Sequence, residues 1–255
     1  VSTNPKLSAA ERLSLLEKAE TCTPYFEYSK MKLSDWYLAA AGTGINQQSN
    51  DYYRQATEQI KKAIEISPNN FKDYYSLGLV YGSWSKSDPS KLSEAEEYLK
   101  KAVELSPNRL GIHFAWGDMY LDLGLLDQAQ KQYEIARELN PEIGETYYDL
   151  AKVAVLKNDE KQTQEYLKLA AEKQYAFSEQ EFWQKMSVLA LQINQPQVAA
   201  KAAAKANEFG ITEQQALVEI QAQLDLSNVA QAQLLAQKYV VVLPEIRSKI
   251  EGLLQ

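Results

Sequence analysis

The sequence predicts an all-α protein built from consecutive pairs of antiparallel helices, and three observations support this fold class. A pattern of small and large apolar residues recurs at about 34 residues, most clearly over residues 110–141. The chain of 255 residues has only 10 Gly and 8 Pro, and both cluster at the ends of predicted helices. Valine and isoleucine do not alternate with polar residues, so we expect no sheet.

The unit over residues 110–141 contains two helices that each present one apolar face. Counted from Leu110, positions 4, 8 and 11 share a face of the first helix, and positions 20, 24 and 27 share a face of the second. Small residues let the two backbones approach closely, and large residues fill the space between them. From position 8 onward these residues are Gly117, Tyr120, Ala129, Tyr133 and Ala136, with Pro141 at position 32.

The same pattern recurs in the two preceding units. The unit over residues 71–109 carries Tyr74, Leu77, Gly78 and Tyr81, then Ala95, Leu99, Ala102 and Pro107. The unit over residues 25–70 ends with Ala56, Ile60, Ala63 and Pro68. We place the extra residues of these units in a loop at 42–50, in an extended helix before it, and at 85–90. A helix over residues 8–21 precedes them as the second helix of an incomplete unit.

This pattern resembles the tetratricopeptide repeat (TPR) family, although His113 and Trp116 depart from its usual residues. The resemblance implies a right-handed superhelical solenoid of about six helix pairs plus a C-terminal closing helix, in a single domain over residues 1–255. The best-matched repeats are 71–109 and 110–143. Divergent repeats are expected at 25–70, 144–179, 180–212 and 213–244, with the closing helix at 244–255.

Turn-forming and capping residues predict where several helices begin and end. Gly124 is expected to adopt the left-handed conformation that ends a helix. A Ser, Thr or Asp followed three residues later by Glu or Gln is typical of a helix N-terminus. This pattern occurs in Ser8/Glu11, Ser93/Glu96, Asp127/Gln130, Ser178/Glu181 and Thr212/Gln215.

Composition and charge bound the possible functions. The net charge of −7 argues against a nucleic-acid partner, which needs a clustered basic face. Cys22 is the only cysteine, so no internal disulfide is expected. No apolar stretch approaches the roughly 20 residues that cross a bilayer, so we expect no membrane insertion of this segment. Because the chain starts at Val1 rather than Met, it is interpreted as an excised piece of a longer bacterial protein.

No residue set predicts catalysis, a metal or a cofactor. His113 is the only histidine, and its position in the first helix favours packing over a ligand or base. One histidine and one distant cysteine give no metal-site spacing. Glu94, Glu96 and Glu97 are interpreted as a solvated helix face rather than catalytic carboxylates. The sequence therefore predicts a protein that is not an enzyme.

A second stripe on the first helices carries the candidate binding residues. In proteins of the family that this chain resembles, positions 2, 5, 9 and 12 line a concave groove that holds a peptide. The candidates at these positions are Lys72, Tyr75, Leu79, Phe114, Asp118, Glu145, Tyr148, Lys152 and Gln184, and the acidic Asp122 beside the stripe is a further candidate. Position 5 is aromatic in three consecutive repeats, and such rings either bind a partner or pack helix against helix.

The stripe lacks the Lys, Asn, Asn, Lys and Arg set with which some family members grip a C-terminal carboxylate. Leu79 and Asp118 stand at the asparagine-type position. We therefore expect an extended ligand with apolar side chains and some basic character, attracted by Asp118, Asp122 and Glu145.

Three functional hypotheses follow. The leading one is a non-catalytic scaffold that binds a protein or peptide in the groove. The second rests on the segments ELSPNRLGIHFAWGDMYLDLG and PEIRSKIEGLLQ, which resemble soluble TPR tails of bacterial membrane proteins of the O-antigen ligase and polymerase type. In that case the parent is membrane-anchored and this segment is a cytoplasmic or extracytoplasmic appendage. The third, an enzyme, needs titratable groups that converge in a pocket, and the sequence offers none.

Overall fold

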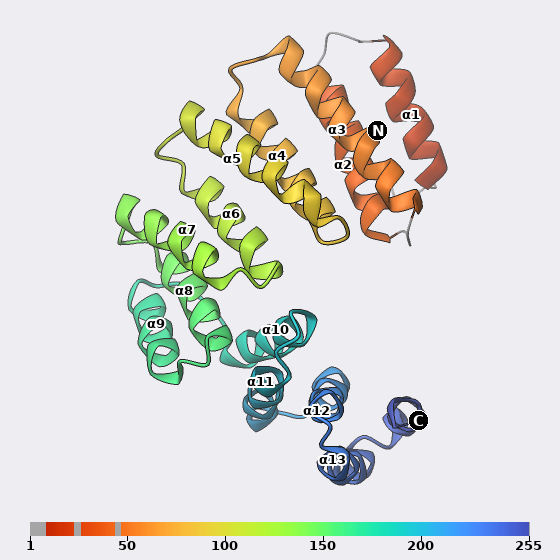
Figure 1. The fold of residues 1–255 in the computed structure, drawn as a ribbon, viewed down its shortest axis with the longest axis vertical. Helices are drawn as coiled ribbons and strands as arrows, with labels where there is room; N and C mark the ends of the chain where they lie inside the picture. Colours follow the sequence, from red (N-terminus) through yellow and green to blue (C-terminus); the bar gives the residue numbers. More distant parts are fainter. Residues whose placement is uncertain (1–8, 23–26, 44–46, 255) are drawn as a thin grey trace. The chain divides into compact units, whose positions relative to one another are not determined.

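A computed structural model describes residues 9–22, 27–43 and 47–254 (Figure 1). Over these residues the chain forms helices and no strand, which confirms the all-α prediction. The chain divides into two compact units, Val1–Met119 and Tyr120–Gln255, and the boundary lies inside helix α6. The single domain expected over residues 1–255 stays a prediction.

The described residues of the first unit form five α-helices, one short 3-10 helix and most of a sixth α-helix. In Figure 1, α2 lies along α3, and α4 lies along α5. The predicted helix over residues 8–21 is present as α1, although Ser8 lies outside the described residues. The elements are α1 (Ala9–Cys22), α2 (Glu27–Thr43), α3 (Gln47–Ile66), α4 (Phe71–Ser85), η1 (Pro89–Lys91), α5 (Leu92–Leu105) and α6 (Leu110–Asp122).

The second unit continues the succession of helix pairs. Helix α8 packs along α9, α10 along α11, and α12 along α13. From α2 to α13 the described residues contain twelve helices in succession, which agrees with the expected number of about six helix pairs, and the expected closing helix follows. The elements are α7 (Leu126–Leu139), α8 (Gly144–Leu156), α9 (Glu160–Glu172), α10 (Glu179–Gln192), α11 (Pro196–Glu208), α12 (Glu213–Asp225), α13 (Val229–Val242), η2 (Pro244–Ile246) and α14 (Arg247–Leu253).

The core follows the spacing of the repeat. The predicted small residues of the second helices have no exposed surface: Ala56, Ala63, Ala95, Ala102, Ala129 and Ala136. Between them, Ile60, Leu99 and Tyr133 are at most 1% exposed. The helix backbones therefore approach at the small residues while the larger side chains fill the space beside them.

Both predicted bounds of the loop over residues 42–50 are wrong. Helix α2 continues to Thr43, and α3 begins at Gln47. The hydroxyl of Ser49 donates to the carbonyl oxygen of Ala41 at 3.0 Å, and the side-chain oxygen of Asn50 accepts from the indole of Trp84 at 2.9 Å. Tertiary hydrogen bonds thus satisfy polar side chains that would otherwise favour a turn.

Three of the predicted helix ends are confirmed. Gly124 has a φ of 72°, as expected for the residue that ends a helix. Ser178 and Thr212 accept hydrogen bonds from the backbone N–H groups of Glu181 and Gln215, each at 3.3 Å. These side chains satisfy N–H groups that have no partner within their helix.

Two predicted caps are wrong. Helix η1 runs directly into α5, which begins at Leu92, so Ser93 already lies inside the helix. Asp88 caps η1 instead, accepting from the backbone N–H of Ser90 at 3.1 Å. Helix α7 likewise begins before Asp127 and has no side-chain cap. The Asp127 carboxylate accepts from the Lys157 ammonium at 2.6 Å.

The close approach of α4 to α5 gives a test. We expect Gly78→Ala to lower the free energy of unfolding by about 1–3 kcal/mol. The added Cβ would lie 2.6 Å from Cγ of Leu99 and 3.2 Å from the carbonyl oxygen of Ala95. Denaturant unfolding followed by circular dichroism measures the change.

Gly111→Ala is the matched control for this substitution. Nothing lies within 4 Å of a Cβ added at Gly111. The higher helix propensity of alanine should therefore leave stability unchanged or raise it by up to about 1 kcal/mol. Equal destabilisation by the two substitutions would contradict the role of Gly78 in helix approach.

Candidate functional site

The candidate stripe of the first unit borders a hollow between α4 and the start of α6. This Tyr75 hollow has a volume of about 280 Å³ and is lined by Phe71, Lys72, Tyr75, Arg109, Gly111 and Ile112. Tyr75 is half-buried and Lys72 is exposed, while Ile112 is only 1% exposed. The hollow therefore has an apolar base and a basic rim.

Charges of both signs surround Tyr75. The guanidinium of Arg109 lies 4.8 Å from the centre of the Phe71 ring, a cation–π contact at the rim. Burial raises the pKa of the Tyr75 hydroxyl, and the nearby Asp118 carboxylate raises it further. Asp118 is exposed, whereas Leu79 and Phe114 are half-buried. Tyr75 thus lies near two basic residues, Lys72 and Arg109, and near one acidic residue, Asp118.

The stripe of the second unit differs, because its aromatic residue is already engaged. The ring centroid of Tyr148 lies 5.0 Å from that of Tyr175, 5.4 Å from Phe177 and 5.3 Å from Phe182. Tyr175 and Phe177 belong to the segment between α9 and α10. Tyr148 is half-buried within this cluster. Here the packing interpretation of the aromatic row describes the contacts better than groove exposure.

Among the remaining candidates of the second unit, Lys152 forms an ion pair, and the other three differ in exposure. The Lys152 ammonium pairs with the Asp149 carboxylate at 2.8 Å and lies 5.6 Å from the centre of the Tyr133 ring. Gln184 is half-buried, and Asp122 and Glu145 are exposed. The binding role of all ten candidates stays a prediction.

The structure agrees with the packing interpretation of His113. This residue lies on α6 and is 5% exposed. Within the described ranges, no group of three or more His, Cys, Asp or Glu residues could hold a metal ion. None of the helices described is long and apolar enough to span a membrane.

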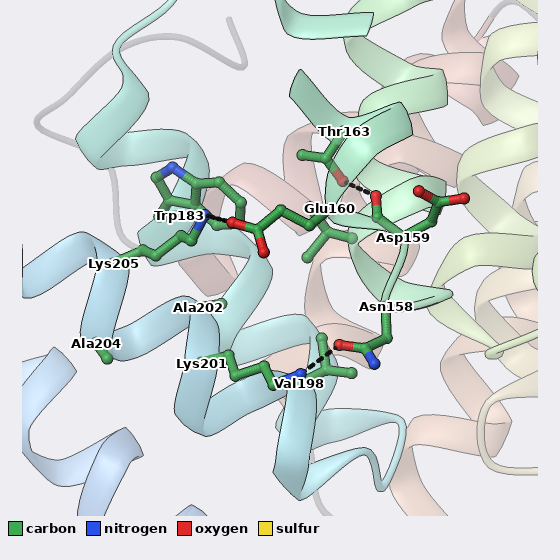
Figure 2. Close-up of a pocket in the computed structure, with 11 residues that line it drawn as sticks. Asn158, Asp159, Glu160, Thr163, Trp183, Val198, Lys201, Ala202, Ala204 and Lys205 are labelled. Carbon is green, nitrogen blue, oxygen red and sulfur yellow. Dashed lines mark hydrogen bonds and ion pairs between the residues drawn. The ribbon is translucent and has the colours of Figure 1, made fainter. Parts of the chain in front are cut away.

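A larger pocket, which the sequence did not predict, lies in the second unit (Figure 2). This α11 pocket has a volume of about 330 Å³. One wall is Trp183 of α10 with Val198, Lys201, Ala202, Ala204 and Lys205 of α11. Facing it are Val155, Asn158, Asp159, Glu160 and Thr163, from the end of α8 to the first turn of α9. None of the ten candidate residues lines it.

Two lysines of α11 reach across the edge of this pocket, Lys205 toward Glu160 and Lys201 toward Asn158 (Figure 2). The Lys205 ammonium lies 2.5 Å from the Glu160 carboxylate and 4.8 Å from the centre of the Trp183 ring. The Lys201 ammonium donates to the side-chain oxygen of Asn158 at 2.8 Å. The hydrogen bond from Lys205 lowers the pKa of the Glu160 carboxyl, and the charges of both lysines lower it further.

One sequence signal for this pocket was available. Helices α9 and α11 have 13 residues each, and they place Tyr166 and Leu167 of α9 at the positions of Ala202 and Ala203 of α11. Of the two alanines, Ala202 lines the pocket, and it is smaller than the tyrosine that the preceding repeat has there. The repeat spacing alone does not show that Trp183 and Val155 lie beside this position, so the sequence does not predict the pocket.

The family comparisons agree with the repeat pattern. Residues 74–109 match the sequence model of the tetratricopeptide repeat family. No curated protein matches the chain.

Several solved structures share the fold of this chain. A tetratricopeptide repeat protein from Parabacteroides merdae is similar with a TM-score of 0.60 and 12% identity, over 96% of this chain and 92% of that one. The APC/C hetero-tetramer Cut9–Hcn1 is similar with a TM-score of 0.56 and 12% identity, over 95% of this chain and 45% of that one. PilW, described as a widely conserved type IV pilus biogenesis factor, is similar with a TM-score of 0.53 and 16% identity, over 86% of this chain and 94% of that one. The chain therefore has the all-α solenoid fold of TPR structures, and residues 74–109 form a tetratricopeptide repeat.

Proposed function

We propose that this protein is a non-catalytic scaffold that binds an extended segment of a protein partner. The observation that carries the proposal is the Tyr75 hollow, where a half-buried tyrosine on the candidate stripe borders unfilled space. Aromatic rings in partly buried positions supply large contact area at low entropic cost and are common binding hot spots. A hollow of about 280 Å³ fits one or two apolar side chains of a partner rather than a whole small molecule.

Charge gives the expected chemistry of the segment. Asp118 is exposed and close enough to Tyr75 to raise the pKa of its hydroxyl. A basic residue of the partner beside the apolar side chain would pair with this carboxylate, and Asp122 and Glu145 would extend the preference. Lys72 and Arg109 at the rim oppose a basic residue at their own side of the hollow. The proposed ligand is therefore apolar with a basic residue on its Asp118 side.

The alternative, an appendage of an O-antigen ligase-like membrane protein, rests on sequence resemblance alone. The family match and the structures compared above do not support it. The two proposals differ in what they require of this chain, because the scaffold proposal needs binding by the isolated segment. Binding experiments on the segment therefore test the leading proposal directly.

The first experiment removes the ring from the hollow. A displayed random-peptide library is selected on the parent chain and on the Tyr75→Ala variant. We expect a peptide class with a large apolar residue to be enriched on the parent and lost from the variant, because the hollow loses its main contact surface. Circular dichroism checks that both proteins keep their helices.

Tyr74→Ala is the matched control, because the neighbouring tyrosine does not line the hollow. The Tyr74 hydroxyl donates instead to the carbonyl oxygen of Pro68 at 3.0 Å. This variant is expected to enrich the same peptides as the parent. If all three proteins enrich the same peptides, or none does, Tyr75 is not a binding residue.

The second experiment tests the charge preference on a synthetic peptide from the enriched class. Asp118→Asn is expected to weaken binding of a peptide with a basic residue by about tenfold, since a charged pair is lost. Lys72→Gln is expected to leave this binding unchanged or to strengthen it, because it removes a like charge. Isothermal titration calorimetry measures both at low and high salt, and salt should weaken binding to the parent. Affinity that changes with neither Asp118 nor salt would contradict the predicted basic ligand.

A further inference from the structure

The α11 pocket is an unfilled space of the second unit that the site described above does not use. Its base is apolar and sheltered: Trp183 and Val155 are each 6% exposed, and Ala202 is 1% exposed. At about 330 Å³ it is at the small end of ligand-binding pockets in proteins. This size fits a large side chain of a partner.

One lining position of the pocket has a small residue where the neighbouring helix has a large one. In α9, Tyr166 occupies the position that Ala202 occupies in α11. The contact positions of α11 remain filled, since Ala199 and Ala206 have no exposed surface. The helix pair therefore packs normally while space stays open beside Trp183.

The two lysines at the rim of the pocket have different partners. The Lys205 charge is balanced by the Glu160 carboxylate at 2.5 Å, and its ammonium lies over the Trp183 ring. The Lys201 ammonium is held by an amide oxygen, that of Asn158, which is a neutral acceptor. The Asp159 carboxylate accepts from the backbone N–H of Gln162 at the N-terminus of α9. Lys201 is thus the cation at this rim that gains most from a carboxylate brought by a ligand.

We propose that the α11 pocket is a second binding site, which takes a protein segment presenting a large apolar side chain next to a carboxylate. The apolar side chain fills the space beside Trp183 and Ala202. The carboxylate, from an Asp or Glu side chain, pairs with the Lys201 ammonium. The site does not depend on the Tyr75 hollow, because all of its residues belong to the second unit and its ligand has the opposite charge preference.

The test uses a seven-residue random-peptide display library on the full chain and on variants. Ala202→Tyr fills the pocket with the residue that α9 has at the same position. Lys201→Gln removes the charge but keeps most of the side-chain length. Tyr75→Ala removes the proposed hollow site of the first unit. Lys168→Gln is the matched control, because its side chain is 77% exposed on α9 and does not line the pocket.

We expect a peptide class with a large apolar residue beside Asp or Glu to be enriched on the parent and on Tyr75→Ala, and to be lost on Ala202→Tyr. A synthetic peptide of this class should bind Lys201→Gln about tenfold more weakly than the parent or Lys168→Gln. Replacing its acidic residue by the amide should weaken binding to the parent by a similar factor, with no further loss on Lys201→Gln.

The proposal fails if no such class is enriched on the parent, or if the class survives on a helical Ala202→Tyr variant. If that variant does not fold, the peptide and Lys201→Gln measurements decide, and equal affinity for parent and Lys201→Gln overturns the proposal. A basic class that is lost only on Tyr75→Ala, without an acidic class, would support the scaffold function and reject this second site.

Discussion

Close contact between helix backbones at a few small residues is the constraint on which the rest of the structure depends. Four alanines of α5 and α7, Ala95, Ala102, Ala129 and Ala136, have no exposed surface. Gly78 leaves no room for even a methyl group against Leu99. Where backbones approach at such points, the large residues between them fill the remaining space, so the spacing of small and large residues in the repeat sets how the helices pack.

Small residues at contact positions let helix backbones approach, whereas a small residue in place of a large one can leave space open. Helix α9 has Tyr166 where α11 has Ala202, and Ala202 lines the α11 pocket. Helix α11 keeps its contact alanines Ala199 and Ala206 fully buried, so its pairing with α10 is retained beside the open space. A helical repeat can thus hold a cavity on one side of a helix without losing its fold.

The aromatic row shows how one sequence position can have two structural roles. Tyr75 borders open space, because the start of α6 presents Gly111 and Arg109 to it rather than large apolar residues. Tyr148 is covered by Tyr175 and Phe177 from the segment after α9. That segment can approach because Gly144 has no side chain: a Cβ there would lie 2.7 Å from Cβ of Tyr175. The two tyrosines share a position in the repeat but have different neighbours.

The sequence by itself determined the succession of helices and the buried positions of the best-matched repeats, because the spacing of small and large residues is a local property that each repeat carries. It also predicted the ends at Gly124, Ser178 and Thr212, where the capping group lies within three residues of its partner or acts through its own backbone. Only the tertiary structure decided that residues 42–43 and 47–50 are helical, that Tyr75 borders a hollow whereas other rings cover Tyr148, and that a pocket opens beside Lys201. Each of these depends on side chains distant in sequence, and no pattern within one repeat specifies which neighbour fills a space and which leaves it open.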